Sequence, residues 1–140
     1  MLSESVEDYL TTILRLESAG QAATTSALAD HLAVARPSVT GMLKRLDTDG
    51  WVVHERYRGA RLTAQGRLRA REVLRRHRLV ETFLVDILGM PADRVHREAH
   101  RLEHALSDEV IERLDAWLGR PARDPHGQRI PGPALRRRSR

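Results

Sequence analysis

The sequence predicts a mainly α-helical protein of two small domains with one β-hairpin, and three observations lead to this prediction. Apolar residues recur at helical spacing over most of residues 6–118, the period of amphipathic helices. A β-branched run at residues 51–56 interrupts that period and runs into a turn, as a hairpin requires. With 140 residues, the chain has room for one compact unit or two small ones that share a core.

Composition excludes several classes of protein. The chain has no Cys, so it cannot form a disulfide framework, an iron–sulfur cluster or a thiolate zinc site. Its acidic N-terminus lacks the basic and then apolar pattern of a signal peptide, and no apolar run approaches the length of a membrane span. We therefore expect a cytoplasmic protein without a membrane partner.

Three helices are predicted in the first half, at residues 6–17, 24–32 and 37–49. Ser5 can cap the first helix and Thr24 or Thr25 the second, and Pro37 fits the first position of the third. The second and third helices are short and joined by a three-residue turn, and the third is basic on its outer side. This arrangement is typical of a helix-turn-helix.

A basic hairpin follows the third helix directly. Residues 51–56 form the first strand, residues 57–60 the tip and residues 61–63 the returning strand. Either piece alone could be an ordinary helical pair or a surface hairpin, but their succession predicts a winged helix-turn-helix. Residues 36–78 carry twelve Lys and Arg against four acids, a net charge of +8, which by itself is as compatible with a solvated basic surface as with a polyanionic partner.

Double-stranded DNA is therefore the predicted partner of the first domain. Basic side chains on the third helix and hairpin would contact phosphates, and short polar ones would approach base edges. The candidate DNA-binding residues are Arg36, Pro37, Ser38, Thr40, Lys44, Arg45, Arg56, Arg58 and Arg61.

The second half predicts further helices at residues 63–88, 95–107 and 108–118, with a break at Gly89-Met90-Pro91. The first of these is apolar on more than one face, so we expect it to pack on a second copy of the chain in a homodimer. The last 22 residues hold four Pro, three Gly and seven Arg, which argues against a folded domain of their own. The expected domains are thus 1–63 for DNA binding, 64–118 for dimerisation and metal binding, and a tail at 119–140.

Histidine and glutamate side chains cluster on the helix predicted at 95–107. At about 100° per residue, His96, His100, Glu103 and His104 fall within an arc of roughly 100°. His77 and Glu81 form another one-turn pair on the preceding helix. Imidazole and carboxylate donors without thiolates leave Mn(II), Fe(II), Co(II), Ni(II) and Zn(II) as candidates, and the later metals of this series bind more tightly in vitro. In a reducing cytosol this donor set favours Mn(II), with Fe(II) next.

The same cluster is also compatible with an enzyme or with a purely structural role. Residues 100–104 match H-x-x-E-H, the signature of a class of zinc peptidases, although the small chain already devotes its first half to DNA. The histidines could also be structural, at an interface of a winged-helix regulator without metal input. We expect no catalytic residues, no enzyme activity and no small organic substrate.

Short motifs spread over the chain carry a family resemblance. They are Val-Glu-Asp-Tyr-Leu at 6–10, Pro-Ser-Val-Thr at 37–40, Leu-Asp-Thr-Asp-Gly at 46–50, Leu-Thr-Ala-Gln-Gly at 62–66, Arg-His-Arg-Leu-Val-Glu at 76–81, Val-His-Arg-Glu-Ala at 95–99, Leu-Glu-His at 102–104, Leu-Ser-Asp-Glu-Val at 106–110 and Pro-His-Gly-Gln-Arg-Ile-Pro-Gly at 125–132. Through these motifs the sequence resembles the diphtheria-toxin-repressor and manganese-transport-regulator family of metal-activated repressors over essentially its whole length.

This resemblance implies a homodimeric repressor of metal-uptake genes that binds a palindromic operator and holds two metal ions per subunit. Asp8 would join His100, Glu103 and His104 in one site, and His77, Glu81 and His96 would form the other. The family's iron-sensing branch has Cys at the position of His100, and its manganese-sensing branch has Glu there. Asp8 matches the manganese-sensing branch, but this chain has Thr11 where that branch has a further carboxylate. The SH3-like third domain of many relatives is not expected.

Overall fold

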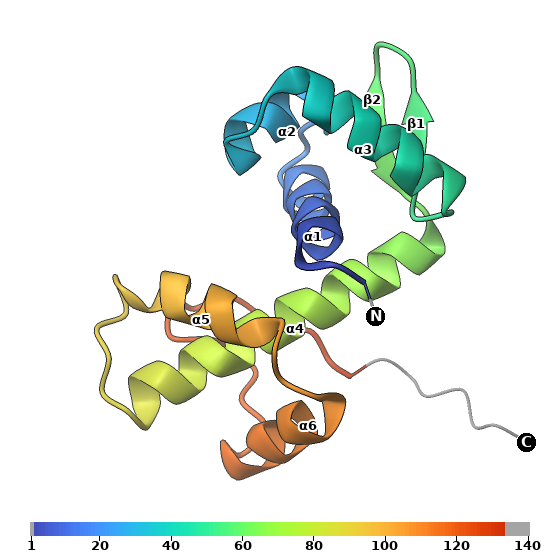
Figure 1. Cartoon of the computed structure of the whole chain (residues 1–140). Helices are drawn as coiled ribbons and strands as arrows, with labels where there is room; N and C mark the ends of the chain where they lie inside the picture. Colours follow the sequence, from blue (N-terminus) through green and yellow to red (C-terminus); the bar gives the residue numbers. More distant parts are fainter. Residues whose placement is uncertain (1, 134–140) are drawn as a thin grey trace, which may run out of the picture. The chain divides into compact units, whose positions relative to one another are not determined.

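The computed structural model describes residues 2–133, which form six helices and one two-stranded sheet (Figure 1). In chain order the elements are α1 (Glu4–Ser18), α2 (Thr25–Leu32), α3 (Arg36–Thr48), β1 (Val52–Glu55), β2 (Gly59–Leu62), α4 (Ala64–Asp86), α5 (Val95–Glu103) and α6 (Asp108–Trp117). The chain divides into two compact units whose boundary lies between Arg71 and Glu72, inside α4. Among the described residues, no helix has both the length and the apolarity to cross a membrane.

The first unit is a winged helix-turn-helix, as predicted. Its core residues come from all three helices and the hairpin, and include Leu10, Ile13, Leu28, Leu43, Leu46 and Val52, each almost fully buried. α1 begins two residues earlier than predicted, because the Ser3 hydroxyl, and not that of Ser5, accepts the Val6 N–H at 3.2 Å. The predicted cap of α2 is confirmed, since the Thr24 hydroxyl accepts the Ala27 N–H.

The hairpin of β1 and β2, here called the wing, is antiparallel and pairs Val52 with Leu62 and Glu55 with Gly59. The predicted strand bounds were wrong, because Gly59 and Ala60 pair within β2 and leave a three-residue tip. Carboxylates occupy both outer edges: Asp47 of α3 accepts the His54 N–H at 3.1 Å, and Glu17 of α1 accepts the Leu62 N–H at 3.0 Å. These two contacts attach the wing to the helices and satisfy groups that an exposed edge would leave open.

Gly59 is required where β2 approaches the α1–α2 connection. Its φ is +86°, and a Cβ there would overlap the carbonyl oxygen of Ala23. We therefore expect Gly59→Ala to lower the free energy of unfolding by about 2 kcal/mol. Gly41→Ala on α3 is the matched control: a Cβ there meets nothing within 4 Å, so it should stabilise the protein slightly. Equal stability of the two variants in urea unfolding would mean that the approach to Ala23 does not require a glycine.

The second unit packs α5 and α6 around the C-terminal part of α4. Its core contains Leu79, Val80, Leu84, Val95, Ala99 and Ile111. A buried ion pair also joins α4 to α6, since Arg75 Nη2 lies 2.8 Å from Asp115 Oδ2. α5 ends four residues earlier than predicted because Ser107 caps the next helix, its hydroxyl accepting the Val110 N–H.

The segment after α6 forms a turn that packs on α4 within the second unit, and so it is not a domain of its own. Ile130 N–H donates to the Ala122 carbonyl, and Arg78 of α4 donates to the carbonyl of Arg129. Residues 134–140, the end of the predicted tail, lie outside the described residues. Residues 119–133 of this segment bring two further titratable side chains, Asp124 and His126, next to α4.

Candidate metal centre and DNA interface

His77 and Glu81 lie one turn apart on α4 and are both buried. His77 Nε2 lies 2.5 Å from Glu81 Oε1, and its Nδ1 forms a close contact with the Glu103 carboxylate of α5. When Nδ1 of a histidine donates its proton to a carboxylate, the ring is fixed with Nε2 available as a ligand. This geometry therefore directs the second nitrogen of His77 toward Glu81.

Two more imidazoles converge on Glu81. His96 Nδ1 of α5 lies 3.2 Å from Oε1, and His126 Nδ1 of the C-terminal segment lies 3.0 Å from Oε2. The other nitrogen of His126 is 2.7 Å from the Ala92 carbonyl oxygen, which again fixes the tautomer and leaves one nitrogen for a ligand. Glu81 is thus surrounded by three histidines from three segments.

Asp124 adds a second carboxylate to this group, here called the Glu81 cluster (His77, Glu81, His96, Asp124 and His126). Its Oδ1 accepts the N–H groups of His126 and Gln128 at 2.9 and 2.8 Å. Its Oδ2 is buried and has no hydrogen-bond partner among the described residues, although His126 Nδ1 is 3.8 Å away. One donor atom each from Glu81, Asp124 and His126 lies within 4.8 Å of the others, and the same holds for His77, Glu81 and His96. A buried carboxylate oxygen with no donor is compensated by a cation, so the donor set fits a divalent metal.

Charge compensation within the cluster shifts three pKa values. Burial alone would lower the pKa of His77, but the hydrogen bonds and charges of Glu103 and Glu81 outweigh it and raise that pKa to about 9. Burial would likewise raise the pKa of Glu81, yet the His77 partner lowers it to about 2. The hydrogen bond to the Ala92 carbonyl raises the pKa of His126. Without metal, His77 is therefore protonated at neutral pH and provides the positive charge.

These pKa shifts predict opposite pH responses with and without metal. In chelator, the protonated His77 stabilises the fold fully below its ordinary pKa of 6.5, and this contribution is lost as pH rises toward 9. We expect the unfolding midpoint in chelator to fall by roughly 5 °C from pH 6.5 to 8.5. With anaerobic Mn(II) the midpoint should rise over the same range, because the metal binds the deprotonated imidazole. His77→Gln should flatten both responses; an unchanged fall in that variant would argue against His77 as the titrating group.

The remaining predicted ligands occupy two places. His100 and His104 lie one turn apart at the end of α5, with ring centroids 5.2 Å apart, and His104 Nε2 lies 3.2 Å from Glu103 Oε1. Glu103 thus contacts His77 with one oxygen and His104 with the other, and this buried carboxylate is the link between the two groups of histidines. Asp8 lies half-buried on α1 of the first unit. The Thr11 hydroxyl donates within α1 to the carbonyls of Glu7 and Asp8.

Asp124 and His126 belong to the Glu81 cluster but were not predicted from the sequence as candidate ligands. Both lie in a segment rich in Pro, Gly and Arg, where no periodic pattern indicates burial. The only signal was the resemblance of residues 125–132 to the family, which carried no side-chain role. Of the residues predicted to share one face of α5, His96 joins the Glu81 cluster, whereas His100 pairs with His104.

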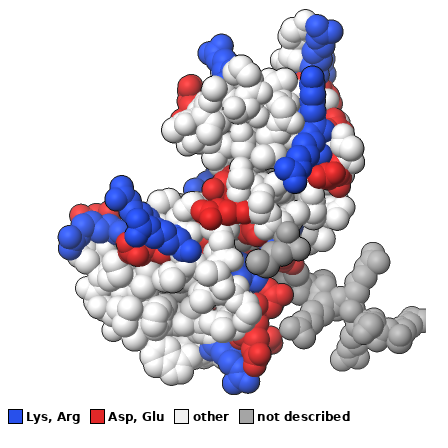
Figure 2. Space-filling model, in the orientation of Figure 1, with Lys and Arg blue, Asp and Glu red and all other residues white. Residues whose placement is uncertain are grey.

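The candidate DNA-binding side chains lie on α3 and the wing of the first unit. Val39, Leu43 and Leu46 of α3 are buried, whereas Arg36, Pro37, Ser38, Lys44 and Arg45 are exposed and Thr40 is half-buried. All three wing arginines are exposed as well. Figure 2 shows Lys and Arg atoms at the wing tip and along the adjoining side of this unit. Apolar contacts thus fix one side of α3 and leave the polar, basic side outward.

Comparison with known families agrees with this architecture. Residues 1–60 match the iron-dependent repressor N-terminal DNA-binding domain, and residues 63–132 match the iron-dependent repressor metal-binding and dimerisation domain. The chain belongs to the iron-dependent repressor family. Members of this family are transcriptional repressors, so the H-x-x-E-H match at 100–104 lies in a family of DNA-binding regulators.

Relatives of this chain include proteins named for iron and for manganese. It is 40% identical over 131 residues to the diphtheria toxin repressor of Corynebacterium diphtheriae, covering 94% of this chain and 58% of that protein. It is 39% identical to the iron-dependent repressor IdeR of Mycobacterium tuberculosis H37Rv, covering 94% and 57%. A solved manganese-dependent transcriptional repressor in complex with manganese matches with a TM-score of 0.85 and 42% identity, covering 91% and 58%. The chain thus spans somewhat over half the length of these relatives.

Proposed function

We propose that this protein is a homodimeric, cytoplasmic transcriptional repressor of metal-homeostasis genes, activated by Mn(II) or Fe(II). The observation that carries the proposal is the convergence of three histidines and two carboxylates in the Glu81 cluster, in a chain whose other unit is a winged helix-turn-helix. DNA binding is assigned to residues 1–63, and dimerisation and metal binding to residues 64–118, with Asp124 and His126 added from the following segment.

Two metal sites per subunit follow from combining the geometry with the family resemblance. The Glu81 cluster would hold one ion through His77, Glu81 and His96 or through Glu81, Asp124 and His126. The second ion would be held by His100, Glu103 and His104 together with Asp8 of the first unit. These nitrogen and oxygen donors favour Mn(II) and Fe(II) among the metals available in a reducing cytosol.

Metal control of DNA binding would follow from the second of these sites. A ligand set drawn from both units joins the DNA-binding unit to the dimerisation unit, and so fixes the spacing of two recognition helices on a palindromic operator. A preference of a few kcal/mol for that arrangement raises DNA affinity by about one to three powers of ten.

Exposed apolar side chains on the second unit support a homodimer. Ile87, Leu88, Val110 and Trp117 are between 45% and 65% exposed, and a second copy of the chain could cover such large apolar side chains. Ile87 and Leu88 directly follow α4, the helix that was expected to pack on a second copy of the chain. Dimerisation would also supply the two-fold symmetry that a palindromic operator requires.

The proposal is tested by DNA binding to a palindromic promoter probe, with chelator and with each of Mn(II), Fe(II), Co(II) and Zn(II). We expect Mn(II) or Fe(II) to lower the Kd by about 10- to 1000-fold. Binding that is equally tight in chelator would favour a winged-helix regulator without metal input. Zinc-dependent peptide hydrolysis without DNA retention would instead favour the peptidase alternative.

A further inference from the structure

The wing carries one acidic side chain among its arginines. Glu55 Oε1 forms a close ion pair with Arg61 Nη2, and its other oxygen, Oε2, lies 4.0 Å from Arg58 Nη1. Each oxygen of this carboxylate therefore faces a different guanidinium. The Arg58 and Arg61 side chains are 84% and 69% exposed, whereas that of Glu55 is 33% exposed, so the carboxylate lies beneath the cations.

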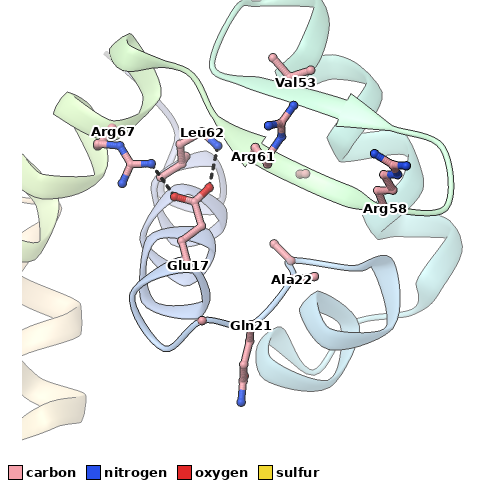
Figure 3. Close-up of a pocket in the computed structure, with 11 residues that line it drawn as sticks. Glu17, Gln21, Ala22, Val53, Arg58, Arg61, Leu62 and Arg67 are labelled. Carbon is pink, nitrogen blue, oxygen red and sulfur yellow. Dashed lines mark hydrogen bonds and ion pairs between the residues drawn. The ribbon is translucent and has the colours of Figure 1, made fainter.

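Strand register explains why these side chains meet. Glu55 pairs with Gly59 and Val53 pairs with Arg61, so Val53, Glu55 and Arg61 share one face of the hairpin. The opposite face, with Val52, Ala60 and Leu62, is buried in the core. Figure 3 shows Val53, Arg58 and Arg61 on the wing side of a pocket, where Glu17 joins Leu62 and Arg67 at the other end. The face of the wing that carries Glu55 and Arg61 is thus the one that does not pack into the hydrophobic core.

From this arrangement we infer that Glu55 is an intramolecular competitor of DNA phosphates, which weakens sequence-independent DNA binding by the wing. A carboxylate and a phosphate offer a guanidinium the same kind of anionic oxygen pair. To contact a phosphate, Arg58 and Arg61 must exchange Glu55 for it, and the displaced carboxylate then lies close to the DNA backbone. The inference rests on the proposed DNA contacts of the wing.

Weaker sequence-independent DNA binding would matter for the metal-free protein. Sequence-independent affinity comes almost entirely from phosphate contacts, and a genome offers a large excess of such sites. Glu55 lowers the positive charge of each wing by one, so it weakens binding where α3 has no cognate bases to read. Metal-free protein would then be released from DNA more completely.

The test uses Glu55→Gln in the full chain, with a duplex that lacks the operator and with chelator present. The control is Glu109→Gln on α6, which removes the same charge from an exposed carboxylate that pairs with Arg113 one turn away. We expect Glu55→Gln to lower the Kd about three- to tenfold at 0.1 M salt and to steepen the dependence of log K on log salt by about one to two per dimer. Glu109→Gln should change the Kd less than twofold.

Two outcomes would overturn the inference. Equal effects of the two substitutions would show that only net charge matters, and weaker binding by Glu55→Gln would show that Glu55 holds the arginines in a DNA-competent arrangement. The Arg58→Ala/Arg61→Ala double variant separates this inference from the proposed function. If it weakens DNA binding while Glu55→Gln has no effect, the inference alone fails; if it binds DNA normally, the proposed wing contacts fail as well. With both arginines replaced, Glu55→Gln should behave like Glu109→Gln.

Discussion

Replacing Asp8 with alanine is expected to lower the operator affinity of the Mn(II)-loaded protein by about 100-fold, close to that of the metal-free protein. The proposed ligand set includes Asp8 of the first unit and three side chains of the second, so this substitution removes the ligand that joins the units. Folding should be retained, because Tyr9 and Leu10 of the same helix turn stay buried in the core. Fluorescence anisotropy with labelled operator measures the affinity, and calorimetry measures the Mn(II) still bound by the Glu81 cluster.

The control for Asp8→Ala is Asp30→Ala, which removes an exposed acid from α2 of the same unit. This variant should show the same ratio of operator affinities with and without metal as the unmodified protein. If Asp8→Ala responded normally to both Mn(II) and Fe(II), metal binding would not act through Asp8, and the proposed connection between the units would be wrong.

Asp115→Ala is expected to cause the largest loss of stability, about 3–5 kcal/mol in the free energy of unfolding. Arg75 Nη2 and Arg120 Nη1 lie 2.8 and 3.3 Å from Asp115 Oδ2, and the Arg75 and Asp115 side chains are only 11% and 10% exposed. Without the carboxylate, the guanidinium of Arg75 remains buried without its partner, and this desolvated charge destabilises the second unit. Urea unfolding in chelator, followed by circular dichroism, measures the loss.

Glu109→Ala is the matched control for this prediction. Its carboxylate pairs with Arg113 on the same helix at 3.2 Å, but both side chains are at least 75% exposed. An exposed pair contributes little, so we expect a loss below about 0.5 kcal/mol. Similar losses in the two variants would mean that burial does not decide the strength of the Asp115 pair.

Local sequence patterns predicted most of the fold. The helical periodicity located α1 to α6, and the β-branched run after Asp49-Gly50 located the wing. Their order predicted the winged helix-turn-helix. The predicted ends of helices and strands were wrong by one to four residues where a cap or a turn sets the boundary. This happened at Ser3, at the wing tip around Gly59, and at Ser107. These boundaries depend on individual hydrogen bonds that periodicity does not encode.

The candidate site was only partly predictable, for a different physical reason. Spacing within one helix revealed His77 with Glu81, and His100 with His104, because residues one turn apart share a face. By contrast, His126 is 45 positions from Glu81, and their contact depends on how the segment after α6 packs on α4. Asp8 had no local signal either, since an acid on the outer side of a helix is usually solvated.

If metal binding and operator binding favour the same arrangement of the two units, as proposed, the two binding equilibria must be thermodynamically linked. The measurement is the Mn(II) affinity of the dimer by calorimetry, with and without saturating operator DNA. We expect operator DNA to tighten Mn(II) binding by the same total factor by which Mn(II) tightens operator binding, about 10- to 1000-fold. Mn(II) affinity that is unchanged by operator DNA would contradict the claim.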